Sequence, residues 1–146
     1  MRKIFLLLLI FISYEGFAQT AEKTTDLFTI TGKVKSERTI TVADLRTYPS
    51  IELHNINTSC SPKREEKTKS VKVVLFKNLL DSVKFEYDNT HKLGHFYFVF
   101  VAADGYKIVF SYNEIFNTEV GNNLYLVTEM DGVKIEAMDS RILLLS

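Results

Sequence analysis

Hydrophobic and polar residues alternate in several short stretches after position 26, and this period of two predicts β-strands. Phe28 and Ile30 indicate the first strand. Further strands are expected, in chain order, around residues 51–54, 71–75, 106–110, 124–130 and 142–145. The pairs Asp104-Gly105 and Asp131-Gly132 are typical of tight turns between such strands. The pattern therefore predicts a protein dominated by β-sheet.

Residues 95–103 (HFYFVFVAA) depart from this alternation because both faces of the stretch are apolar. A strand that is hydrophobic on both faces is typical of the covered centre of a sheet. We therefore expect a central, fully buried strand here, preceded by a linker over residues 85–94.

Short helices are expected at three points in the chain. Residues 41–44 (TVAD) have the form of a capping box, and Pro49 ends the helix that it starts. Residues 76–83 carry apolar side chains at helical spacing. Ser111 and Glu114 form a second capping box. Together these features predict an α+β fold, a sheet-dominated mixed domain with two or three short helices at its margins.

The N-terminus has the pattern of a secretory signal peptide. Arg2 and Lys3 precede the apolar run of residues 4–12, and a small-residue cleavage site follows, with cleavage expected after Ala18 or Gln19. The apolar run is shorter than the ~20 residues that a transmembrane helix needs. Residues 1–19 are thus predicted to direct a Sec-type export to the periplasm or the medium, with no membrane span in the mature chain.

The mature chain, residues 20–146, is predicted to be a single domain. Of 18 basic and 18 acidic residues, cleavage removes Arg2, Lys3 and Glu15, which leaves 16 and 17. This balance indicates neither a polyanionic partner nor nucleic-acid binding. The last predicted strand ends one residue before the C-terminus, which favours a domain shortened at that end.

The motifs of common enzyme classes are absent, including nucleophile elbows, phosphate-binding loops and paired cysteines. Cys60, the only cysteine, excludes an internal disulfide. It lies in an expected loop over residues 59–70, four residues before Arg64, whose charge would favour a thiolate. Cys60 is therefore a buried small residue, an intermolecular link, a reactive thiol or a metal ligand. Solvation of a charged loop explains its neighbours equally well.

Six segments along the chain share their pattern and order with one known family. They are residues 28–34 (FTITGKV), 40–45 (ITVADL), 73–80 (VVLFKNLL), 103–106 (ADGY), 110–117 (FSYNEIFN) and 129–132 (EMDG). In this order they resemble the oxidoreductase molybdopterin-binding domain of sulfite oxidases and of small stand-alone bacterial relatives. The resemblance implies a domain of the sulfite oxidase type.

The same resemblance implies particular site residues and a molybdenum-pterin cofactor. Catalytic members of the family hold molybdenum through the cysteine of a C-x-G-N-R motif, of which Cys60 and Arg64 match the first and last letters. Cys60 would be the metal ligand, Cys60 and Arg64 would bind the cofactor, and Tyr106 falls near the catalytic tyrosine. Pro62 and Lys63 replace the glycine and asparagine of the motif. The closing basic segment of the family, which helps to hold the pterin phosphate, is absent before the chain ends.

Export bears on the choice between a catalytic and a non-catalytic protein. Pterin cofactors are inserted in the cytoplasm, and catalytic relatives leave folded through a twin-arginine signal, whereas this chain has Arg2-Lys3. We therefore expect a non-catalytic module that binds a small ligand or a partner protein. The alternative is a molybdenum-pterin oxidoreductase in which Cys60 ligates the metal and Arg64 and Tyr106 face an oxyanion. A third hypothesis is an unrelated β-rich adhesion or binding module.

Overall fold

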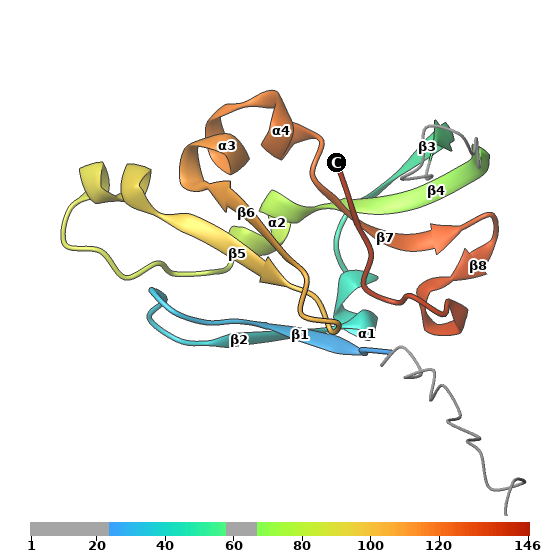
Figure 1. Ribbon diagram of the computed structural model, residues 1–146, viewed down its shortest axis with the longest axis horizontal. Coiled ribbons are helices and arrows are strands. Elements are labelled where there is room, and N and C mark those ends of the chain that lie inside the picture. The colour runs from blue at the N-terminus through green and yellow to red at the C-terminus, as the bar shows by residue number, and fades with distance from the viewer. Residues whose placement is uncertain (1–23, 58–66) are drawn as a thin grey trace, which may run out of the picture.

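The computed structural model describes residues 24–57 and 67–146. These residues form nine strands, four short α-helices and two 3₁₀-helices, a sheet-rich α+β structure (Figure 1). The strands hydrogen-bond in three antiparallel sheets, one of five strands and two of two strands. The α+β, sheet-dominated class predicted from the sequence is confirmed. The short helices exceed the two or three expected.

The five-stranded sheet is built around β4 (Lys67–Leu75), which pairs with β3 (Ser50–Asn57) on one side and β7 (Tyr125–Met130) on the other. The far edge of β7 pairs with two very short strands, β8 (Val133–Lys134) and β9 (Leu144–Leu145). Val71, Val73 and Val74 of β4 are fully buried. The central position in the molecule thus belongs to β4.

The other two sheets are ribbons of two strands each. One joins β1 (Leu27–Ile30) to β2 (Arg38–Thr41), and the other joins β5 (Tyr97–Val101) to β6 (Lys107–Ser111). The turn of the second ribbon lies at Asp104-Gly105, as predicted, and Gly105 has a φ of +87° that favours glycine. The Ala102 N–H donates a hydrogen bond of 2.9 Å to the Tyr106 carbonyl across this turn.

Both predicted capping boxes are present and start α1 (Val42–Leu45) and α3 (Tyr112–Asn117). The Asp44 N–H donates to the Thr41 hydroxyl at 3.1 Å, and the Asp44 carboxylate accepts from the Thr41 N–H at 2.9 Å. Ser111 and Glu114 repeat this arrangement. The remaining helices are α2 (Phe76–Leu80), α4 (Glu119–Asn122), η1 (Thr90–His95) and η2 (Ile135–Ala137).

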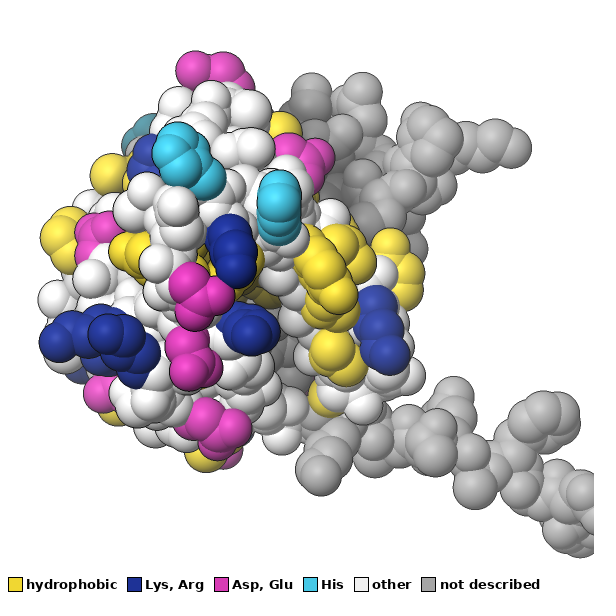
Figure 2. Space-filling model, turned by 90° about the vertical axis from the view of Figure 1, so that its left-hand side faces the viewer, with side chains coloured by type: hydrophobic (Ala, Val, Ile, Leu, Met, Phe, Trp, Pro, Cys, Tyr) yellow, Lys and Arg dark blue, Asp and Glu magenta, His cyan; other side chains and the backbone are white. Residues whose placement is uncertain are grey.

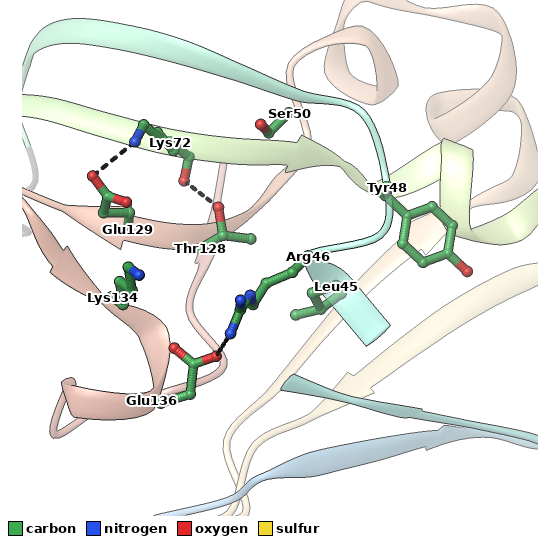
Figure 3. Close-up of a pocket in the computed structure, with 9 residues that line it drawn as sticks. All are labelled: Leu45, Arg46, Tyr48, Ser50, Lys72, Thr128, Glu129, Lys134 and Glu136. Atoms are coloured by element: carbon green, nitrogen blue, oxygen red, sulfur yellow. Dashed lines mark hydrogen bonds and ion pairs between the residues drawn. The ribbon is translucent and has the colours of Figure 1, made fainter. Parts of the chain in front are cut away.

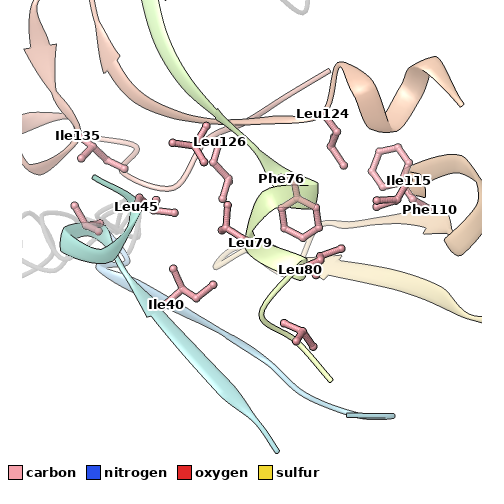
Figure 4. Close-up of a cluster of buried hydrophobic side chains, with 13 residues drawn as sticks. Ile40, Leu45, Phe76, Leu79, Leu80, Phe110, Ile115, Leu124, Leu126 and Ile135 are labelled. Carbon is pink, nitrogen blue, oxygen red and sulfur yellow. The ribbon is translucent and has the colours of Figure 1, made fainter. Parts of the chain in front are cut away.

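One hydrophobic core connects the three sheets and the helices (Figure 4). Its buried side chains come from strands, helices and loops far apart in the chain: Ile40, Val42, Leu45, Val74, Phe76, Leu79, Leu80, Val83, Phe110, Ile115, Leu124, Leu126 and Ile135. A smaller cluster of Val71, Val73 and Val127 lies on the other face of the large sheet. The short α-helices therefore act mainly as carriers of core side chains.

The prediction of a fully buried central strand over residues 95–103 is wrong. The strand is shorter, β5, and its side chains alternate, with Tyr97 69% and Val101 61% exposed while Phe98 and Phe100 face the core. A two-stranded ribbon covers the core with one face only, so the other face remains on the surface.

Two expected connections also differ from the structure. The predicted loop over residues 59–70 is wrong at its C-terminal end because β4 already begins at Lys67. The predicted linker over residues 85–94 contains the start of η1 and a single β-bridge between Val34 and Phe85. Within residues 24–57 and 67–146, no helix is long and apolar enough to cross a membrane.

Candidate functional site

A polar pocket of about 150 Å³ lies beside the large sheet, where α1 and the turn after it approach β7 and η2 (Figure 3). Residues from four stretches of the chain line it: Leu45, Arg46, Tyr48, Ser50, Lys72, Thr128, Glu129, Lys134 and Glu136. Five of these nine residues are charged. Side chains of both charges, distant in sequence, converge around this cavity.

A helix end and a β-bulge form the two walls of the pocket. On one side the capping box of Thr41 and Asp44 starts α1, and Arg46 closes the helix as its C-cap. On the other side β4 and β7 shift register after Lys72, because Glu129 lies opposite Lys72 while Val127 lies opposite Val73.

Thr128 is the extra residue of this β-bulge, and its hydroxyl donates to the Lys72 carbonyl at 3.1 Å. A bulge of this kind changes the direction of the side chains next to it. Here it lets the neighbouring residues Thr128 and Glu129 both line the pocket.

Two ion pairs border the cavity. Lys72 Nζ lies 2.9 Å from Glu129 Oε1, and Arg46 Nη1 lies 2.9 Å from Glu136 Oε1. Lys134 is drawn between the two pairs in Figure 3 and has no ion pair within 4 Å in the described part of the chain. The pocket thus carries one more positive than negative charge, and Lys134 is near enough to Glu136 to help lower the pKa of that carboxyl.

The pKa shifts of the lining groups favour their charged forms. The pKa of Glu136 is lowered, first by a hydrogen bond to its own backbone N–H and then by the Arg46 guanidinium. The pKa of Lys72 is raised, chiefly by its hydrogen bond to Glu129. A carboxylate with a lowered pKa is a poor general acid, and a lysine with a raised pKa is a poor base or nucleophile at neutral pH. These groups are therefore suited to fixed-charge recognition.

The structure does not bring Tyr106, the predicted catalytic residue, into this pocket. Tyr106 follows the Asp104-Gly105 turn of the β5–β6 ribbon, and its side chain is 69% exposed. Its backbone N–H donates to Asp104 Oδ1 at 2.8 Å, which is a property of the turn. Cys60 and Arg64, the predicted metal ligand and cofactor-binding residues, lie outside the described residues. Within the described part of the chain, no group of three or more metal-binding side chains comes together.

Sequence reasoning did not find the residues that line the pocket. Lys72 and Glu129 are 57 positions apart, and Arg46 and Glu136 are 90 apart. Glu129 entered the sequence analysis only as part of a segment that resembles a family pattern. The one local signal was Lys72 among the valines of β4, and this places a charge on a strand without identifying its partner.

Comparisons with protein-family models, with curated proteins and with solved structures gave no match for this chain. The functional argument therefore rests on the geometry and charge of the pocket.

Proposed function

We propose that this protein is an exported, non-catalytic binding module whose polar pocket holds a small anionic ligand. The observation that carries this proposal is the excess of one positive charge in a cavity that several elements build, where Lys134 is the cation outside the two ion pairs. A ligand carboxylate, phosphate or sulfate group would accept hydrogen bonds from Lys134 and from the outer N–H groups of Arg46. Ser50 and Thr128 add hydroxyl groups for the polar remainder of the ligand.

The size of the pocket supports a ligand of only a few non-hydrogen atoms. Its volume of about 150 Å³ is well below the ~300 Å³ at which pockets for drug-sized ligands begin. A pterin cofactor is too large to be enclosed there. The pocket is therefore a candidate site for a small anion, separate from the residues that the family resemblance assigns to molybdenum.

Titration of the folded protein with sodium sulfate, inorganic phosphate and acetate tests the proposal, with binding followed by NMR chemical shifts at constant ionic strength. We expect at least one of the three to shift the amide signals of β8 and η2 in a saturable way. Lys134→Ala should raise the Kd for the anion that binds about tenfold, because a hydrogen bond to a charged group contributes about 1.5 kcal/mol. Lys107→Ala, which removes a lysine of β6 outside the pocket, is the matched control.

Saturable shifts that both variants retain, or no saturable shift with any of the three anions, would contradict binding in the pocket. The non-catalytic part of the proposal has its own test. Elemental analysis of the exported protein should find no molybdenum, whereas stoichiometric molybdenum that is lost in Cys60→Ser would establish the oxidoreductase alternative.

A further inference from the structure

The outer edge of β5 presents backbone hydrogen-bonding groups that β6 does not use. At the two ends of the ribbon, the Tyr112 N–H donates to the Phe96 carbonyl, and the Ala102 N–H donates to the Tyr106 carbonyl. Hydrogen-bonded pairs alternate along an antiparallel ribbon, and Val99 lies opposite Val109 in this register. The residues of β5 that hydrogen-bond to β6 are therefore the even-numbered ones. The N–H and C=O groups of Tyr97, Val99 and Val101 therefore point away from β6. Among the described strands, β5 pairs with β6 alone.

The same three residues also expose their side chains. Tyr97, Val99 and Val101 are 69%, 46% and 61% exposed, and none is charged. Figure 2 faces the end of the molecule at which η1 leads into β5, and hydrophobic side chains gather on the surface there. An uncharged, β-branched and aromatic edge without proline is the kind of edge to which another strand adds.

The outer edge of β6 is different. Its Ser111 N–H already donates to the Glu114 carboxylate at 2.7 Å within the capping box, and Lys107 places a charge on the strand. Natural proteins commonly protect edges in this way. The β5 edge has neither of these protections.

We propose that β5 pairs antiparallel with β5 of a second copy of this chain, across a two-fold axis at Val99. The five residues of β5 have Val99 in the middle, so Val99 would face its own counterpart and Tyr97 would face Val101. All three residues direct their free backbone groups outward, so the pairs Val99–Val99 and Tyr97–Val101 would be hydrogen-bonded, while Phe98 and Phe100 would face each other in the non-hydrogen-bonded pairs between them. No like charges meet, because β5 contains none. The two ribbons would become one four-stranded sheet.

The area available sets the strength of this association. Joining two five-residue strand edges, with contacts between the side chains next to the seam, would bury at most on the order of 1,000 Å² in total. Stable interfaces bury ~1,600 Å², so this value lies at the low end of specific contacts. We therefore expect a weak, reversible dimer that forms at tens to hundreds of micromolar protein.

Sedimentation velocity of the mature protein over a range of concentrations measures the dimer. The weight-average sedimentation coefficient should rise with concentration, and Val99→Lys should raise the dissociation constant at least tenfold. Val133→Lys is the matched control, because Val133 is also a strand valine with 46% exposure but lies on β8. Circular dichroism of each variant establishes that it is folded.

Disulfide trapping tests the register separately, in a Cys60→Ser background. Facing residues of a hydrogen-bonded antiparallel pair have Cα atoms ~5.5 Å apart, within disulfide range. Val99→Cys should therefore form a covalent dimer on mild oxidation. Val101→Cys should not, because the two copies of residue 101 lie roughly 14 Å apart along the paired strands.

Three outcomes would overturn the proposal. A chain that stays monomeric at every concentration would leave the edge to a strand of another protein. If Val133→Lys raised the dissociation constant of the dimer as much as Val99→Lys does, β5 would not be the interface. Covalent dimers of the Val101→Cys chain that form as fast as those of the Val99→Cys chain would exclude the register centred on Val99.

Discussion

Single side chains determine where the first and third α-helices begin. Thr41 with Asp44, and Ser111 with Glu114, satisfy backbone N–H groups that the first turn of a helix leaves unpaired. In each pair the partners are three residues apart, so the chemistry is fully contained in the local sequence. This is why both helix starts could be predicted from the sequence. The end expected at Pro49 is wrong, because α1 already ends at Leu45 with Arg46 as its C-cap.

The Ser111–Glu114 capping box makes stability depend on pH in acid. Hydrogen bonds from the Ser111 N–H and hydroxyl lower the pKa of Glu114 below its ordinary value of 4.5. The folded chain therefore binds fewer protons at this site than the unfolded chain, so the stabilisation is present above pH 4.5 and is lost as the pH falls through the lowered value. Glu114→Gln should reduce the free energy of unfolding at pH 7 and flatten its fall below pH 4.5.

Urea unfolding at a series of pH values between 7 and 3 measures this dependence. Glu37→Gln, which changes an exposed carboxylate in the turn between β1 and β2, is the control and should leave the curve of the parent chain unchanged. If the free energy of unfolding fell equally with pH in the parent chain and in Glu114→Gln, the Glu114 carboxylate would not stabilise the folded chain as the structure implies.

Elements are harder to predict than residues because their surroundings come from distant parts of the chain. Residues 95–103 are apolar on both faces, which predicted a covered strand. In the structure β5 covers the core through Phe98 and Phe100, and no described element lies over Tyr97, Val99 and Val101. The pattern indicated a strand correctly, but it could not distinguish a face covered within one chain from a face left open on a ribbon.

The contact between α3 and α4 depends on a glycine. Gly121 of α4 is buried, and a Cβ atom there would clash with the backbone carbonyl of Ile115 in α3. Since a backbone carbonyl in a packed helix has little freedom to move, Gly121→Ala should lower the free energy of unfolding by about 3 kcal/mol. Gly94→Ala is the control, because its Cβ would meet only the Asn113 side-chain nitrogen at 3.7 Å.

Chemical denaturation of the two variants compares them directly. Gly94→Ala should unfold within about 0.5 kcal/mol of the parent chain, as expected for a substitution with ordinary contacts. Equal stabilities of the two alanine variants would mean that α4 can move away from α3 at little cost, against the close approach seen in the structure.

At the scale of the whole molecule, the pocket shows what the sequence could not reveal. Its ion pairs join α1 to η2 and β4 to β7, so they exist only once the sheet and the core have formed. The residues picked out from the sequence, Cys60, Arg64 and Tyr106, came instead from a resemblance between short segments. Of these three only Tyr106 is described, and it lies on a hairpin outside the pocket.

The predicted signal peptide is the remaining statement about the whole molecule, and it has a direct test. When the complete chain is expressed in a bacterium with a periplasm, intact-mass measurement of the exported protein should give an N-terminus at Gln19 or Thr20. Leu7→Arg places a charge in the apolar run and should leave the full-length chain in the cytoplasm. Leu27→Arg, the same change at an exposed position of β1, should still be cleaved and exported.

The outcome also bears on function, because a Sec-type route exports the chain unfolded and leaves any pterin cofactor in the cytoplasm. Cleavage that continues when the twin-arginine pathway is inactivated would support a module that folds and binds its ligand after export. Retention of Met1 in a cytoplasmic product would instead remove this argument against a cofactor. The molybdenum content of the parent chain, compared with that of Cys60→Ser, would then decide between a non-catalytic module and a molybdenum-pterin oxidoreductase.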